Sequence, residues 1–146
     1  MCFLSLPPGL INVLTPFVAG GLRRGEQVFC AQRPEILKRL VHDLIFLGLN
    51  PDHERECGAL DLLTEEGAYF PQKHFEPLAA MDLLIRSIDK TRAAGGCTSF
   101  RSAGELSWAA QGRNDCDRVI GYEEMVEEYD PGPGPPLVIG SIRWKN

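Results

Sequence analysis

The sequence has no long apolar segment and no surplus of positive charge. Its 146 residues contain 15 lysines and arginines against 20 aspartates and glutamates, which gives a net charge of −5. A nucleic-acid surface needs a cationic patch to neutralise phosphates, and a membrane-spanning helix needs about 20 consecutive apolar residues. Neither is present, so we expect the protein to bind no nucleic acid directly and no membrane.

Cysteines at metal-binding or redox spacing are also missing. The chain has five cysteines, an odd number, and none of them belongs to a C-x-x-C motif. The three histidines show no spacing typical of metal ligands. The first residues, MCFLSLPPG, lack the basic leader and long apolar stretch of a secretory signal. We therefore expect reduced cysteines in a cytoplasmic protein, without a metal or cofactor.

The chain lacks the glycine-rich loop and lysine with which nucleotide hydrolases hold phosphates. After the first apolar run it reads SLPPGLINV, with one glycine and no Gly-Lys-Ser/Thr. The glycines of GGLRRG (20–25) fall before a strand-like run, where they are typical of a helix end. No Ser-His-Asp or Cys-His set can be assembled from local spacing. We expect a protein that is not an enzyme.

Short apolar runs alternate with helical periodicity along the whole chain. Most of the runs are continuous, which favours strands buried on both faces of a parallel sheet. The predicted strands are 2–6, 27–31, 60–64, 97–102 and 137–144, and the predicted helices are 8–24, 35–47, 76–93 and 116–129. The order predicts an α/β fold, a mostly parallel sheet of about five strands flanked by helices, with residues 1–146 as one domain.

Two helices carry boundary signals. Gly48 is expected to end the helix over 35–47. Pro16 interrupts the segment 8–24, which is predicted to form either two helices, with Thr15 as the second N-cap, or one kinked helix.

Ligands of open α/β sheets bind beyond the carboxyl ends of the strands. RSAGELSWAAQG (101–112) follows the fourth predicted strand. Ser102 and Glu105 have the spacing of a capping box, but Gly104 and Trp108 also suit a binding pocket, and both interpretations stay open. After the third strand, the adjacent carboxylates Glu65 and Glu66 could hold a metal or act as acid and base, or they favour the positive end of a short turn capped by Thr64. The candidate ligand-binding residues are Glu65, Tyr69, Arg101, Glu105 and Trp108.

An ordered series of motifs resembles a known family. The series is GLRRGE (21–26), LLTEEGAYF (62–70), HFEP (74–77), GELSWA (104–109) and GYEE (121–124). It covers nearly the whole chain and resembles the MEDS family, the sensory domains of methanogen and methylotroph proteins.

The resemblance implies a cytoplasmic sensory domain with a sheet like that of RecA and KaiC but without a working P-loop. It implies a regulatory role beside an output module, either a transcription regulator or a signalling kinase. Gly21, Gly25 and Glu26 are expected to serve a helix-to-strand turn. The matching signature positions are Gly21, Gly25, Glu26, Tyr69, Gly104, Glu105, Trp108, Tyr122 and Glu123.

The sequence therefore predicts a domain that binds a small-molecule signal at the carboxyl edge of the sheet and controls an output module or partner protein. Two alternatives remain: a protein-interaction module without a ligand, and a degenerate RecA-like nucleotide-binding domain. Self-association is also left open.

Overall fold

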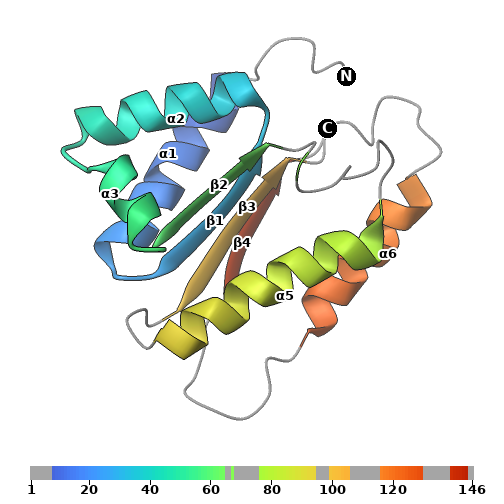
Figure 1. The fold of residues 1–146 in the computed structure, drawn as a ribbon. Coiled ribbons are helices and arrows are strands. Elements are labelled where there is room, and N and C mark those ends of the chain that lie inside the picture. Colours follow the sequence, from blue (N-terminus) through green and yellow to red (C-terminus); the bar gives the residue numbers. More distant parts are fainter. Residues whose placement is uncertain are drawn as a thin grey trace.

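The computed structural model describes residues 8–64, 67, 76–94, 99–105, 116–129 and 139–144. Within these ranges, helices and strands alternate along the chain (Figure 1). The helices are α1 (Pro8–Arg23), α2 (Pro34–Phe46), α3 (Pro51–Glu56), α5 (Pro77–Ala94) and α6 (Cys116–Glu128), and the strands are β1 (Gln27–Gln32), β2 (Leu60–Thr64), β3 (Phe100–Glu105) and β4 (Ile139–Trp144).

The four described strands form one parallel sheet in the order β2-β1-β3-β4. In register, Gln32 at the end of β1 lies opposite Thr64 of β2, and Ala31 lies opposite Gly104 of β3. The chain first moves from β1 outward to β2 and then returns to the other side of β1 for β3. Strand order therefore reverses between β1 and β3, the topological switch point at which open α/β sheets bind ligands.

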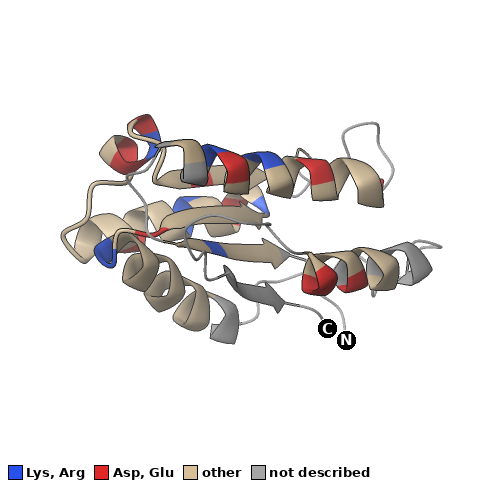
Figure 2. Ribbon diagram, turned by 90° about the horizontal axis from the view of Figure 1, so that it is seen from below, with Lys and Arg blue, Asp and Glu red and all other residues tan. Residues whose placement is uncertain are grey.

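Helices cover both faces of the sheet (Figure 1). On one face, α1 and α2 bury residues such as Leu14 and Leu40 against Val28 and Cys30. On the other face, α5 and α6 pack their apolar side chains around Phe29. Figure 2 shows that the charged residues lie mainly on the helices, while the described strands carry few. This layered burial explains why the middle of β1, Val28–Ala31, is apolar at every position rather than alternating.

Two helix ends confirm predicted glycine positions. Gly48 follows α2 with a φ of 87°, and the N–H of Leu49 donates to the carbonyl of Leu44 at 3.0 Å. Gly25 follows α1 with a φ of 76°, and the N–H of Glu26 donates to the carbonyl of Gly21 at 3.0 Å. Both arrangements are Schellman motifs, in which glycine adopts the left-handed conformation without a Cβ clash.

The elements differ from the prediction in three respects. The third described strand begins at Phe100, three residues later than predicted. The six-residue helix α3 was not predicted. Pro16 lies inside α1, which is assigned as one helix, so the division into two helices capped by Thr15 is wrong. The predicted strand over 2–6 lies outside the described residues, and the likeness to RecA stays a prediction.

None of the helices in the described ranges combines the length and the apolar character needed to cross a membrane.

Candidate functional site

The carboxyl edge of the sheet at the switch point is the candidate functional site. Gln32 ends β1 there, and Gly104 is the penultimate residue of β3. Gly104 is buried and lies opposite Ala31 in the β1–β3 ladder. Because glycine carries no side chain, the backbone of β3 at this edge can be approached closely.

Gln32 is an unusual polar group of this edge. Its exposed fraction is 1%, and its Oε1 atom is buried without a hydrogen-bond partner in the structure. Leaving a buried acceptor unsatisfied costs about 1–3 kcal/mol, and native proteins rarely do so without a reason. The polar end of the side chain therefore offers an acceptor that the described part of the protein does not use.

The local sequence accounts for the position of Gln32. β1 is buried along its whole length, so its last side chain is held inside the fold. Arg33 follows with φ −63° and ψ 149°, and Pro34 then begins α2. Proline favours the first turn of a helix and an extended residue before it. The strand therefore has to stop at Gln32, directly at the sheet edge.

Below this edge, on the face covered by α5 and α6, lies a cavity of about 20 Å³. Phe29, Gly104, Tyr122 and Val126 contribute to its wall. This volume has room for about one water molecule. A larger ligand would therefore have to lie outside the edge rather than inside the core.

The sequence-predicted site residues fall into two groups. Glu65, Tyr69 and Trp108 lie outside the described residues, and Glu105 ends β3 with its backbone alone described. The capping turn considered for Thr64 is observed, because its Oγ1 accepts a hydrogen bond from the N–H of Gly67 at 3.1 Å.

Arg101 does not lie at the carboxyl edge. Since β3 begins at Phe100, Arg101 is its second residue and pairs with Val28 near the start of β1. It lies at the amino-terminal edge of the sheet, opposite to the end where Gln32 lies. The predicted position is wrong because pairing with β1 shifts the strand by three residues. We therefore leave Arg101 out of the site.

Structural contacts surround Arg101 instead. Its Nη2 atom lies 2.9 Å from Oε1 of Glu26, and its Nη1 donates to the carbonyl of Phe17 at 2.9 Å. The guanidinium carbon lies 4.8 Å from the centre of the Phe17 ring. A Cβ atom on Gly21 would lie 3.0 Å from Cδ of Arg101. The signature residues Gly21 and Glu26 thus join α1 to β3, whereas only a turn had been predicted for them.

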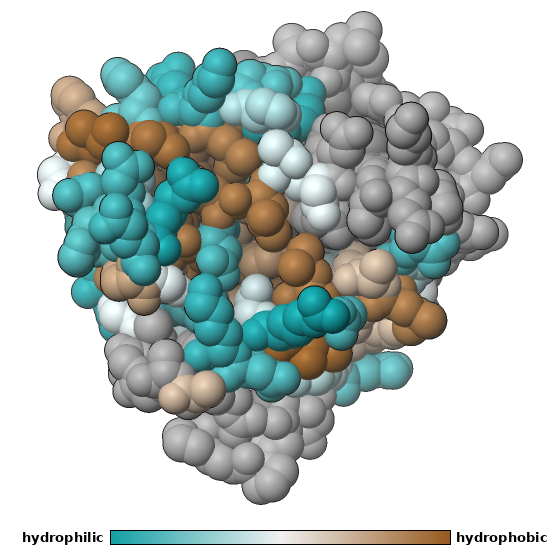
Figure 3. Space-filling view, in the orientation of Figure 1, coloured by the Kyte–Doolittle hydropathy of each residue, from teal (hydrophilic) through white to brown (hydrophobic). Residues whose placement is uncertain are grey.

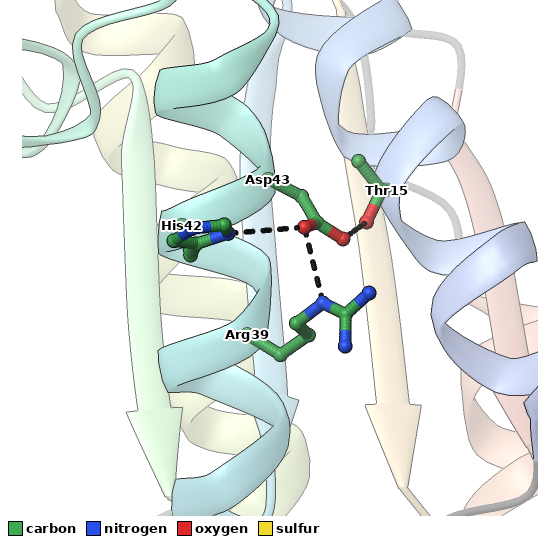
Figure 4. A network of polar contacts seen from close by, with 4 residues as sticks. All are labelled: Thr15, Arg39, His42 and Asp43. Atoms are coloured by element: carbon green, nitrogen blue, oxygen red, sulfur yellow. Dashed lines mark hydrogen bonds and ion pairs between the residues drawn. The ribbon is translucent and has the colours of Figure 1, made fainter.

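A second polar cluster joins α1 to α2 (Figure 4). Arg39 Nε donates to Asp43 Oδ1 at 3.1 Å, and Thr15 Oγ1 donates to Asp43 Oδ2 at 3.3 Å. Nδ1 of His42 lies 3.5 Å from the same carboxylate. Burial raises the pKa of Asp43, but hydrogen bonds from Arg39, His42 and Thr15 and the charge of Arg39 outweigh it and lower that pKa overall.

Two further observations concern cysteine and metal chemistry. Complete burial of the Cys30 thiol raises its pKa to about 12, so the thiol stays protonated and unreactive at neutral pH. Within the described ranges, the His, Cys, Asp and Glu residues form no cluster of three or more that could hold a metal ion.

Gln32 is not among the candidate site residues predicted from the sequence. The available signal was a polar residue directly after the apolar run Val28–Ala31 and directly before an Arg-Pro helix start. That pattern does not reveal whether a neighbouring group satisfies the amide, since the answer depends on packing between elements distant in sequence.

Comparison with known proteins places these features in a family. The family model described as MEDS, the methanogen/methylotroph DcmR sensory domain, matches residues 1–135. No curated protein and no solved structure matches the chain significantly. Because the match spans most of the sequence, the chain belongs to the MEDS family of sensory domains.

Proposed function

We propose that this sensory domain binds a small polar molecule at the carboxyl edge between β1 and β3, with Gln32 as its central contact. The observation that carries the proposal is the buried, unsatisfied Oε1 atom of Gln32 at the switch point of the sheet. An acceptor kept there at a cost to stability suits a ligand that supplies the missing donor.

The chemistry of Gln32 limits the class of ligand. A carbonyl oxygen accepts from N–H or O–H groups, so the ligand must carry at least one such donor. The side-chain amide of Gln32 is already shielded from water. A ligand that hydrogen-bonds to it therefore displaces few water molecules from the protein. A hydroxyl-, amine- or amide-bearing small molecule fits this requirement, whereas a purely apolar molecule does not.

The residues predicted from the sequence complete the proposal. Glu65 and Tyr69 follow β2, whose Thr64 lies beside Gln32 in register. Glu105 ends β3, and Trp108 follows it. Segments after adjacent parallel strands emerge at the same edge. We therefore assign Trp108 and Tyr69 to apolar walls of the site and Glu65 and Glu105 to further polar contacts.

The proposed role is binding and signalling, without a chemical reaction, in the cytoplasm. Ligand binding would favour one of two arrangements of the domain relative to an output module, either a transcription regulator or a signalling kinase. The ligand shifts this equilibrium only by its difference in affinity for the two arrangements.

Native mass spectrometry of the purified chain, repeated under denaturing conditions, tests the proposal. The sample is first incubated with a low-molecular-mass extract of the expression host. We expect a mass excess that disappears on denaturation and that is absent from Gln32→Leu.

The control is Gln27→Leu, at the opposite end of the same strand, which should keep the mass excess. A bare polypeptide mass in the wild type, or an unchanged excess in Gln32→Leu, would contradict the proposal. The mass of the bound species would also distinguish a nucleotide from other ligands.

A further inference from the structure

We propose that the outer edge of β2, which no described strand covers, is a docking site for an extended, acidic segment of a partner protein, which adds to the sheet as a further strand. This inference goes beyond the ligand site and does not depend on it. It rests on the backbone geometry of β2, the groove along that strand, and the charges on one rim of the groove.

β2 lies at the end of the described sheet and pairs with β1 alone. The N–H of Val28 donates to the carbonyl of Ala59 at 2.8 Å. Backbone groups of alternate residues point to opposite sides of a strand, so those of Asp61 and Leu63 also face β1. The N–H and C=O of Leu62 therefore face outward, ready to pair with an added strand.

A groove of about 700 Å³ runs along this edge. The four consecutive residues from Leu60 to Leu63 all contribute to it, together with residues of α3 and α5. A face of the sheet would expose only every second residue, so the groove opens onto the strand edge itself. In Figure 3, apolar side chains lie between hydrophilic ones on the face that carries this edge.

The two rims of the groove differ in charge. On α5, Arg86 and Lys90 contribute to the groove and have exposed side chains. On α3, the carboxylates Asp52 and Glu56 contribute to the opposite rim together with one cation, Arg55. Counting Asp61 of β2 with Arg86 and Lys90, the α5 side of the groove has one more cation than carboxylates, and the α3 side has one more carboxylate than cations.

The spacing of the cations matches an extended chain. Arg86 and Lys90 are four residues apart on a helix, a rise of about 6 Å. Alternate residues of a β-strand are about 6.6 Å apart. Two acidic side chains at alternate positions of the segment can therefore face both cations.

The present partners of these cations leave them able to bind such a segment. Arg86 pairs with Asp82 on the same helix at 2.8 Å, with 75% of its side chain exposed. Lys90 reaches across the edge to Asp61 at 3.7 Å. Exposed ion pairs contribute only about 0–1 kcal/mol, so exchanging Asp82 for a carboxylate of the segment costs little.

The opposite rim determines the intervening residues. Leu62 packs against the core shared with α1 and α2. On the same side, Asp52 and Glu56 outnumber the cation Arg55, so this rim repels carboxylates. Apolar residues therefore fit between the acidic ones. The segment we propose alternates acidic side chains towards α5 with apolar side chains towards α3.

A second copy of this chain fits the edge less well. Two β2 edges related by a two-fold axis would pair antiparallel and keep each face of the sheet on the same side. The α5 helices of the two copies would then be neighbours, with Arg86 and Lys90 near their own counterparts. Like charges in contact oppose this arrangement.

Fluorescence anisotropy with a labelled seven-residue peptide tests the inference. The peptide has glutamate at every second position and valine between. Two control peptides replace glutamate by lysine, or keep the composition and place the glutamates side by side. We expect the full chain to bind the alternating acidic peptide at least about tenfold more tightly than either control.

Two pairs of variants localise the binding. Arg86→Glu should weaken binding of the acidic peptide at least tenfold. Lys38→Glu makes the same charge change at an exposed position of α2 and should leave the affinity unchanged. Leu62→Pro removes the outward N–H and should abolish binding, while Leu62→Ala keeps that N–H and should retain most of it. Circular dichroism verifies that each variant is folded.

Equal affinity for all three peptides, or unchanged peptide binding by folded Leu62→Pro, would overturn the inference. So would a dimer in size-exclusion chromatography whose stability changes in Arg86→Glu, because the edge would then bind a second copy of the chain. The mass excess in the native mass spectrum tests only the ligand site at the carboxyl edge, whereas peptide binding tests only the edge of β2. Failure of either proposal is therefore distinguishable from failure of the other.

Discussion

Two glutamines at opposite ends of β1 differ in what surrounds them. Gln27 and Gln32 both have an exposed fraction of 1%. The Gln27 amide donates to Oδ2 of Asp61 at 2.9 Å, so it has a structural partner. The Oε1 atom of Gln32 has none among the described residues. Equal burial with unequal hydrogen bonding is the basis for assigning one residue to the fold and the other to a ligand.

Asp43 gives a pH-dependent prediction at the same scale. Its pKa is lower in the folded protein than its ordinary value, so the ionised carboxylate stabilises the fold above the unfolded pKa of about 4. This stabilisation is lost as the pH falls through the lower, folded pKa. We expect Asp43→Asn to have a lower free energy of unfolding than the wild type at pH 7.

Urea unfolding of both proteins between pH 7 and pH 2 measures this effect. The difference in free energy should be constant down to about pH 5 and then shrink as the wild-type carboxylate becomes protonated. A difference that stays the same throughout the acid range would show that charge on Asp43 does not stabilise the α1–α2 contact.

From the sequence, the carboxyl edge can be predicted as the place of a candidate site, whereas the positions of Arg101 and Gln32 depend on packing. Adjacent parallel strands made the carboxyl edge a reasonable expectation. Arg101 was misplaced because its strand boundary depends on where β3 meets β1 in register. Gln32 was missed because its lack of a partner depends on the three-dimensional packing around it.

At the scale of elements, α1 meets the sheet through its glycines. A Cβ atom on Gly21 would lie 2.8 Å from Cγ2 of Val28, whereas one on Gly20 would approach Nη1 of Arg101 only to 3.5 Å. The first contact requires β1 or α1 to shift, and the second is an ordinary contact. The two neighbouring glycines therefore have different tolerance for a methyl group.

We expect Gly20→Ala to raise the free energy of unfolding by up to about 1 kcal/mol, because alanine favours the helix. Gly21→Ala should lower it by about 1–3 kcal/mol, since overpacking outweighs that gain. Thermal and urea unfolding check both variants. Equal effects of the two substitutions would mean that α1 does not pack closely on β1 and β3.

Element prediction succeeded where apolar patterning decides the structure. The run 60–64 matches β2, and 27–31 lies within β1, because both strands pack apolar side chains against the helical layers. Helix α3 was missed because six residues, PDHERE, show no apolar periodicity. Helix α1 continues through Pro16, and the burial of Leu14, Val18 and Leu22 explains why. Their contacts outweigh the one backbone hydrogen bond that proline removes.

At the scale of the whole molecule, the sheet presents two separate surfaces. The carboxyl edge carries Gln32, and the lateral edge of β2 carries Leu62. β2 borders both, because its Thr64 lies opposite Gln32 while Leu62 contributes to the lateral groove. Strand order creates this arrangement, and periodicity alone could not predict that order. In our proposals, the carboxyl edge binds the signal and the lateral edge of β2 binds the partner.

Urea unfolding of wild type, Gln32→Leu and Gln27→Leu, each refolded and dialysed free of small molecules, shows whether the unsatisfied amide of Gln32 lowers the stability of the ligand-free protein. If Gln32 is kept for a ligand, Gln32→Leu should be more stable than the ligand-free wild type by about 1 kcal/mol. Gln27→Leu should be less stable, because Asp61 loses its hydrogen bond. A loss of stability in Gln32→Leu as large as that in Gln27→Leu would contradict the account.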